Sequence, residues 1–257
     1  MPADWGHGMN PWLFLNSGKG GAAFNMALDE ALLEAVTRLR APVLRFYGWT
    51  EPAASFGYFQ KFAEIERTTW LRPLVRRPTG GGIVPHDADW TYSFAVPPHH
   101  EWHSLRAIES YRRMHDWVRL GFEKLNIPTE LAPEKKAAPG NPGSASPGEC
   151  FTGHEKFDVL WHGKKIAGAA QRRNKLGLLI QGSVQPPPVA RAREDWENAM
   201  RAAASDAFSI EWKPLSPDDS LLSRTAELAR QKYSLADYNQ KRQGGGNPQN
   251  LNSKQND

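Results

Sequence analysis

The sequence predicts an α+β protein in which a mixed, largely antiparallel sheet packs against helices. Segments typical of strands outnumber those typical of helices in the middle of the chain, and the helical patterns gather toward its two ends. This segregated order favours an α+β fold over the regular alternation that builds a parallel sheet. The chain has 257 residues, of which 40% are hydrophobic and 23% charged, so it can bury a sizeable core.

The elements of the N-terminal half follow from periodicity and from the positions of proline and glycine. Apolar residues spaced three and four apart between Phe24 and Ala35 predict an amphipathic helix after a glycine-rich loop at 17–21. A second helix is expected over 104–124, where apolar residues again recur at helical spacing. Strands are expected where short apolar or aromatic runs are bounded by proline or glycine, over 43–47, 74–77 and 91–96.

The C-terminal half begins with a segment rich in Pro, Gly, Ala and Ser, 132–148, which predicts a flexible loop leading to Cys150. The turn pair His162-Gly163 between two apolar runs then predicts a hairpin. A further strand over 178–184 and helices over 194–204 and 220–233 complete the expected fold. From Gln240 onward apolar periodicity is lost, so one domain over 1–239 and a disordered tail over 240–257 are expected.

The composition argues against several functional classes. The 32 Lys plus Arg against 28 Asp plus Glu give a net charge of +4, which is mild and shows no basic stripe or motif of a nucleic-acid module. No segment reads as a signal peptide or a membrane span, and one cysteine allows no internal disulfide, so a cytoplasmic protein is expected. His99, His100 and His103 lack acidic or cysteine partners, so no metal site is expected.

The most distinctive motif runs from Arg76 to Asp87 and contains Gly80, Gly81 and Gly82. Three glycines after a strand let the backbone approach a ligand and present its N–H groups. The pair Arg76-Arg77 has the chemistry to hold a carboxylate or a phosphate. A glycine-rich hairpin turn explains the same residues without a ligand, and the P-loop and dinucleotide-binding spacings are both absent.

Two further features are candidates for chemistry. Lys165 is expected on a strand beside the small residues 168–170, where it can reach into a pocket, although a solvated basic strand also fits. Cys150 is either a buried small hydrophobe or a reactive thiol. Its place after a loop and before a basic cluster favours the thiolate, because nearby cations lower the pKa of a thiol. His154 is a candidate base, but a surface histidine is the simpler interpretation.

Taken together, these motifs resemble the family of lipoate–protein ligase A and the octanoyltransferases, which is related in fold to the biotin–protein ligases. The match covers about residues 12–239 and keeps the family's order of elements. The matching segments are Asn25 to Glu30, then Trp49 to Gln60 (W-x-x-P-x-x-S-x-G-x-x-Q), Arg76 to Asp87 (R-R-x-T-G-G-G-x-V-x-H-D) and Lys165 to Arg173 (K-I-x-G-x-A-Q-R-R).

The resemblance implies one of two main chemistries. Ligases use ATP and Mg²⁺ to form a lipoyl-adenylate and then acylate a lysine of a carrier protein. Transferases of the type first seen in Gram-positive bacteria take octanoate from acyl carrier protein onto a cysteine and pass it to that lysine. The sole cysteine, Cys150, lies just before the lysine hairpin, and too few structured residues follow Pro188 for a ligase accessory domain, so the transferase is favoured.

Two other functions stay open. An amidotransferase that moves lipoyl groups between carrier proteins uses a cysteine on the same fold. A non-catalytic binding partner is disfavoured because both Cys150 and Lys165 are present.

For the transferase, the resemblance implies neither cofactor nor metal, with octanoyl acyl carrier protein as donor and a lipoyl domain or glycine cleavage H protein as acceptor. Cys150 would attack the thioester, and Lys165 would hold the acyl carbonyl and favour the thiolate. The other residues expected at the substrate are Arg76, Arg77, Gly80, Gly81, Gly82, His86, Gly168, Ala169 and Ala170. Two departures from the family pattern affect this site, because Ala169 stands where serine is frequent and Gln181 stands where histidine is usual.

Overall fold

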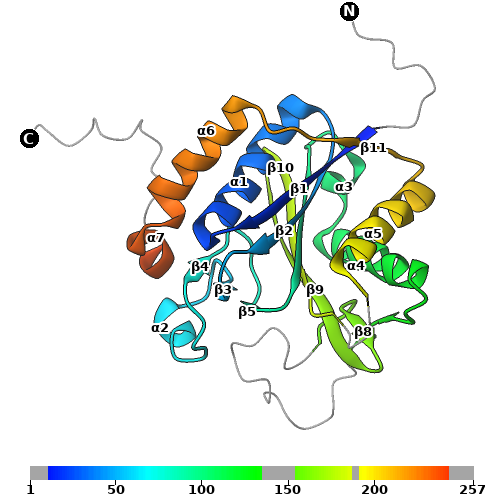
Figure 1. Cartoon of the computed structure of the whole chain (residues 1–257), viewed down its shortest axis with the longest axis horizontal. Helices are drawn as coiled ribbons and strands as arrows, with labels where there is room; N and C mark the ends of the chain where they lie inside the picture. Colours follow the sequence, from blue (N-terminus) through cyan, green and yellow to red (C-terminus); the bar gives the residue numbers. More distant parts are fainter. Residues whose placement is uncertain (1–10, 135–153, 187–190, 243–257) are drawn as a thin grey trace, which may run out of the picture.

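The computed structural model describes residues 11–134, 154–186 and 191–242, which build a large sheet, a small sheet and the helices around them (Figure 1). The large sheet has eight strands in the order β11-β1-β2-β6-β10-β9-β8-β7 within these residues. Only β11–β1 and β1–β2 pair in parallel there, so the predicted mixed, largely antiparallel sheet is confirmed. The strands are β1 (Pro11–Gly20), β2 (Val43–Trp49), β6 (Trp90–Val96), β7 (Glu130–Leu131), β8 (Val159–Trp161), β9 (Lys164–Asn174), β10 (Gly177–Val184) and β11 (Glu211–Pro214).

The small sheet carries the glycine motif. Its strands are β3 (Ala53–Phe56), β4 (Leu74–Arg76) and β5 (Val84–His86), with β3 in the centre. The short helix α2 (Phe62–Ile65) lies in the connection from β3 to β4, and the three glycines lie in the loop from β4 to β5. The small sheet therefore holds both ends of the glycine loop.

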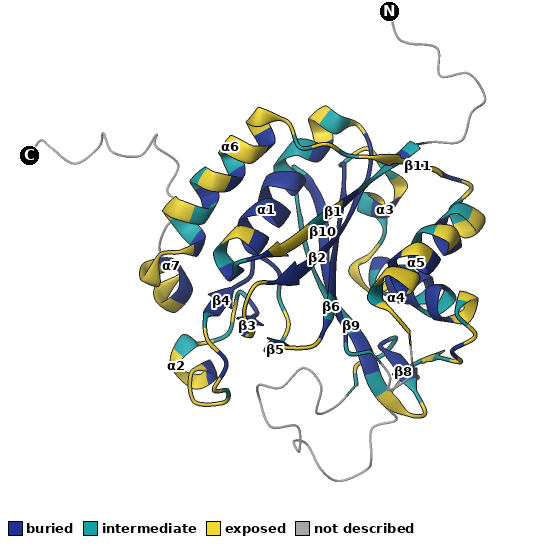
Figure 2. Ribbon diagram, viewed as in Figure 1, coloured by how far each residue is buried: buried dark blue, intermediate teal, exposed yellow. Residues whose placement is uncertain are grey.

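Helices cover both faces of the large sheet (Figure 1). One group is α1 (Ala22–Leu39), α6 (Asp219–Leu228), η1 (Ala229–Tyr233) and α7 (Ala236–Lys241), and the other is α3 (Glu101–Ser104), α4 (Ala107–Lys124) and α5 (Arg193–Phe208). Residues of β2 alternate between the two cores, because side chains of a strand point to opposite faces in turn. Leu44 and Phe46 pack with Trp196 of α5, whereas Val43 and Tyr47 pack with α1. Figure 2 shows the buried sides of these helices turned toward the sheet.

The structure corrects several expected elements. The expected loop at 17–21 is mostly strand, because β1 continues to Gly20 past an irregularity between Asn16 and Lys19 where Gly18 adopts a φ of 67°. The helix expected over 104–124 is two helices, since Leu105 is extended with a ψ of 148°. The strands β1, β3, β5 and β11 were not predicted.

The C-terminal boundary also differs from the expected one. Helix α7 includes Gln240 and Lys241, which the sequence interpretation placed in the tail. The rest of that predicted tail, 243–257, lies outside the described residues, as do Cys150 and most of the predicted loop at 132–148. Over the described ranges, no helix combines the length and the apolar character needed to cross a bilayer.

Candidate active site

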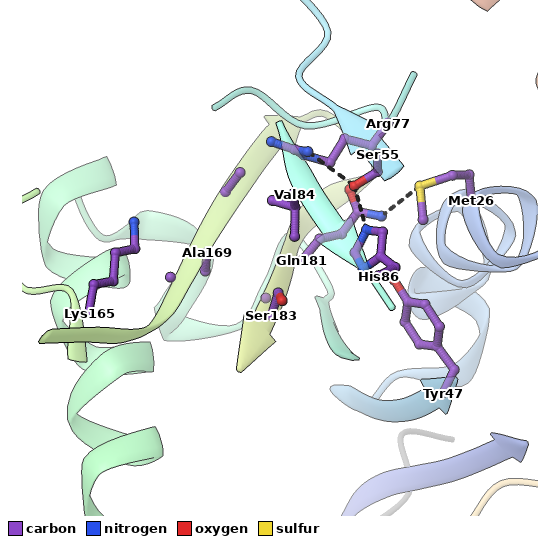
Figure 3. Close-up of a pocket in the computed structure, with 13 residues that line it drawn as sticks. Met26, Tyr47, Ser55, Arg77, Val84, His86, Lys165, Ala169, Gln181 and Ser183 are labelled. Atoms are coloured by element: carbon purple, nitrogen blue, oxygen red, sulfur yellow. Dashed lines mark hydrogen bonds between the residues drawn. The ribbon is translucent and has the colours of Figure 1, made fainter. Parts of the chain in front are cut away.

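A pocket lies where β9 and β10 meet the small sheet and the N-terminal part of α1 (Figure 3). Its walls are mostly small or apolar, and Lys165 lies on the opposite side of the pocket from Met26 and Tyr47. Five predicted site residues besides Lys165 share this pocket, namely Arg77, His86, Gly168, Ala169 and Ala170. The structure thus brings together residues that are far apart in the sequence. The remaining lining residues are Met26, Tyr47, Ser55, Val84, Gln181, Gly182 and Ser183.

An irregularity in the β8–β9 pairing aims Lys165 into the pocket. Leu160 pairs with Lys165 and Val159 with Ala167, so β9 carries one extra residue at this point. Residues three apart in a regular strand point to opposite faces, but a bulge lets Lys165 and Gly168 share one side. A Cβ on Gly168 would lie 2.8 Å from Lys165 Cε, so glycine leaves room for the lysine side chain. Lys164 is exposed instead.

A buried carboxylate holds the Lys165 ammonium. Lys165 Nζ lies 2.8 Å from Asp158 Oδ2, and the two side chains are 6% and 0% exposed. The Tyr111 hydroxyl and the Glu155 backbone N–H also donate to Asp158. Burial and the charge of Asp158 raise the pKa of Tyr111, so it remains a donor. Sequence reasoning missed Asp158, because its contact with Lys165 depends on the extra residue in β9, which no local pattern reveals.

The histidine behind this pair is neutral near pH 7. His115 is fully buried, and burial lowers its pKa to about 4. Its ring stands edge-on to Tyr111 at 4.1 Å between centroids. It therefore adds no charge beside Lys165 and Asp158.

Arg77 shapes the glycine loop from inside. Its Nη2 donates to the carbonyls of Gly80 at 2.8 Å and Gly82 at 2.6 Å, and its Nη1 donates to Ser55 Oγ at 3.1 Å. A Cβ on Gly57 would lie 1.9 Å from the Gly81 carbonyl oxygen, so the loop packs directly on β3 and requires glycine at 57. Arg77, which lines the pocket, thus holds Gly80 and Gly82, whereas none of the three loop glycines lines the pocket itself.

Arg76 has a different position from its neighbour. It is 1% exposed and does not line the pocket. Its guanidinium donates to the carbonyls of Tyr58 at 2.6 Å, Gln60 at 2.7 Å and Asn239 at 2.8 Å. Arg76 therefore joins the turn after β3 to helix α7 and sets the frame of the loop.

Gln181 links the glycine loop to a buried ion pair. Its Oε1 accepts from Thr79 Oγ1 at 2.7 Å and its Nε2 donates to Asp29 Oδ2 at 2.7 Å. Asp29 pairs with Arg45 at 2.7 Å, and both side chains are fully buried. Gln181 thus accepts on one side and donates on the other, as a neutral histidine does with its two ring nitrogens. The amide therefore makes contacts of the kind that the histidine expected at this position from the family resemblance would make.

A second polar chain forms the wall beside Gln181. Ser55 Oγ lies 2.8 Å from His86 Nε2, and His86 Nδ1 lies 2.8 Å from Asp89 Oδ2. Ser55 Oγ also accepts from Arg77 Nη1, so the serine joins His86 to the arginine that holds the glycine loop. The His86 ring stacks on Trp49 at 3.9 Å between centroids. These contacts fix the rotamer of His86 at the pocket wall.

The predicted nucleophile, Cys150, lies outside the described residues. His154 is described and half-buried, but it does not line the pocket. Across the described ranges, no three or more His, Cys, Asp or Glu residues gather as a group able to hold a metal ion. The role of Cys150 stays a prediction.

The fold agrees with the comparison with known families. Residues 21–185 match the model of the lipoyl protein ligase A/B catalytic domain, and the chain belongs to that family. The family membership and the enzymatic character predicted from the sequence are thereby confirmed.

Individual proteins of known name show which members of the family this chain resembles. The chain is 38% identical over 276 residues to octanoyltransferase LipM of Halalkalibacterium halodurans, with 90% of this chain and 99% of the relative aligned. It is 40% identical over 182 residues to octanoyltransferase LipM of Anoxybacillus flavithermus, covering 67% of this chain and 64% of the relative. A crystal structure of lipoate-protein ligase A bound with ATP superposes with a TM-score of 0.71 at 21% identity, over 90% of this chain and 99% of that one. The structural match confirms the predicted fold class.

Proposed function

We propose that the protein is an acyltransferase of lipoate biosynthesis that passes an octanoyl group to a lysine of a lipoyl domain through a thioester on Cys150. The single observation that supports this most is the buried Lys165 ammonium facing a largely apolar pocket. An ammonium beside an apolar channel suits a fatty acyl group whose carbonyl carries partial negative charge. The full-length likeness to an octanoyltransferase agrees with this chemistry.

The acyl chain can lie along the pocket, from the end at Lys165 to the end at Met26 and Tyr47. With the carbonyl at Lys165, an extended chain would pass Ala169 and Val84 and end at Met26 and Tyr47 (Figure 3). Burying each CH₂ group contributes about 0.8 kcal/mol, so the tail of an octanoyl group adds several kcal/mol to binding. The same term favours octanoyl over shorter acyl groups.

The reaction we propose has two balanced steps. The Cys150 thiolate attacks the carbonyl of the donor thioester, the bond to the donor sulfur breaks, and the donor leaves as a thiolate that takes up a proton. The amine of the acceptor lysine then attacks the Cys150 thioester, an amide forms, a proton is released and the Cys150 thiolate is restored. Lys165 would stabilise the negative oxygen that develops in both steps.

We propose octanoyl acyl carrier protein as donor and a lipoyl domain or glycine cleavage H protein as acceptor, without cofactor or metal. The ligase alternative, which needs ATP and Mg²⁺, is less supported. Its support is a structural likeness at 21% identity, which bears on the fold alone, whereas the relatives at 38% and 40% identity are octanoyltransferases.

The donor distinguishes the two functions in one experiment. An unlipoylated lipoyl domain is incubated with the protein and either octanoyl acyl carrier protein or octanoate with ATP and Mg²⁺, and its intact mass is measured. We expect the mass of the lipoyl domain to increase by one octanoyl group only when octanoyl acyl carrier protein is the donor. An increment that appears only with octanoate and ATP would replace the transferase by the ligase.

A further inference from the structure

Two aromatic side chains are unusually exposed on the segment that joins β3 to β4, residues 57–73. Phe59 is 76% exposed and Trp70 is 80% exposed. Other exposed large apolar side chains among the described residues are at most 46% exposed. Aromatic side chains are enriched at protein–protein interfaces relative to the rest of the protein surface.

Hydrogen bonds from a buried arginine hold the turn that carries Phe59. Arg76 Nη1 donates to the carbonyls of Tyr58 at 2.6 Å and Gln60 at 2.7 Å, on either side of Phe59. The Gln60 side chain accepts from the Gly57 backbone N–H at 2.9 Å. A buried arginine thus fixes a turn whose central side chain faces solvent. A preorganised aromatic anchor of this kind loses little conformational entropy when it binds a partner.

The same segment also contains buried apolar side chains. A lack of apolar residues to pack against therefore does not explain why Phe59 and Trp70 are exposed. Ile65 and Leu71 are 2% and 4% exposed and pack with Phe56 and neighbouring apolar side chains. Leu71 is buried although it directly follows the exposed Trp70. The segment therefore separates residues that stabilise it from residues it presents outward.

This turn adjoins the glycine loop of the candidate active site. The Tyr58 backbone N–H donates to the Thr79 carbonyl at 2.8 Å. Gly57 packs against Gly81 so closely that a Cβ at position 57 would lie 1.9 Å from the Gly81 oxygen. A protein bound over Phe59 would therefore lie beside the loop that borders the pocket.

We propose that Phe59, together with Trp70 of the same segment, is the docking anchor for the acceptor domain that carries the target lysine; this rests on the proposed function. A lysine side chain is short, so its domain must bind at the rim of the pocket, whereas a donor thioester on a long prosthetic arm can reach in from farther away. Lys61, Arg67 and Arg72 against Glu64 and Glu66 give the segment a net charge of +1, so it does not repel an acceptor with a negatively charged surface.

The test is steady-state transfer to an unlipoylated lipoyl domain by the full-length chain. Phe59→Ala should raise the KM for that domain about ten-fold, equivalent to about 1.4 kcal/mol, with kcat at saturating domain unchanged. Trp70→Ala should raise the same KM. Phe59→Tyr should keep the wild-type KM, and Leu222→Ala, which removes a 46% exposed side chain on α6, serves as the matched control.

The outcomes separate this inference from the function on which it rests. An unchanged KM for the lipoyl domain in Phe59→Ala overturns the docking site, as does a rise in the KM for the octanoyl donor alone. A wild-type protein that transfers nothing to the lipoyl domain overturns the proposed function, whatever the variants do.

Discussion

Replacing Lys165 by methionine removes an ammonium from a buried ion pair while keeping most of the side-chain volume. Lys165 Nζ and Asp158 Oδ2 lie 2.8 Å apart, and the Asp158 side chain is 0% exposed. Breaking a buried pair from one side costs about 3–5 kcal/mol, because the other charge stays buried without its partner. Asp158 keeps its bonds from Tyr111 and the Glu155 backbone, so we expect the lower end, about 3 kcal/mol.

Two companion variants separate stability from chemistry. Asp158→Asn combined with Lys165→Met removes both charges and should recover much of the lost free energy of unfolding, measured by urea denaturation. Octanoyl transfer should fall about 10²–10³-fold in both the single and the double variant, because the cation at the carbonyl is gone. Lys164→Met changes an exposed side chain and should leave both quantities near wild type. A stable Lys165→Met, or a damaging Lys164→Met, would refute the assigned strand register and the buried pair.

Substitutions at Gln181, Gly57, Gly80 and Met26 test the pocket and the glycine loop beside it. Gln181→His should keep transfer at pH 8, since a neutral imidazole can accept and donate as the amide does. Gln181→Leu should lower the free energy of unfolding in urea by about 2 kcal/mol. If the two variants have the same stability and the same transfer rate, Gln181 does not bridge Thr79 and Asp29. Gly57→Ala should displace the loop at Gly81 and abolish transfer, while Gly80→Ala, with open space around its Cβ, should be tolerated in the same assay. Met26→Ala should raise the rate with dodecanoyl relative to octanoyl donor; an unchanged ratio would mean that the acyl chain ends elsewhere.

Much of the fold was predictable because local patterns and tertiary packing agree. The alternation in 91–96 and the His162-Gly163 turn predict β6 and the β8–β9 hairpin, and both form. Strand β3 was missed because Ala53 to Phe56 is a short run without alternation that is buried on both sides. Strand β11 was missed since its pairing with β1 joins segments about 200 residues apart, beyond any local signal.

Several residues of the pocket could be predicted from the sequence, but the hydrogen bonds and ion pairs between residues could not. The motif spacing pointed to Arg77, His86, Lys165 and Gly168, and all four line one pocket. Asp158 was not predicted, because its role depends on an extra residue in β9 that reorients Lys165. Arg76 and Arg77 are adjacent in sequence yet contact different carbonyl groups on different sides of the loop, which only the tertiary structure determines.

In the proposed reaction, an octanoyl group passes through a thioester on Cys150. The most direct measurement is the intact mass of the protein after mixing with octanoyl acyl carrier protein in the absence of acceptor. We predict one octanoyl increment, removed by neutral hydroxylamine as a thioester is, and no increment in Cys150→Ala. An increment of the same size in Cys150→Ala, or octanoylated lipoyl domain formed at the wild-type rate by that variant, would show that the octanoyl group does not pass through Cys150.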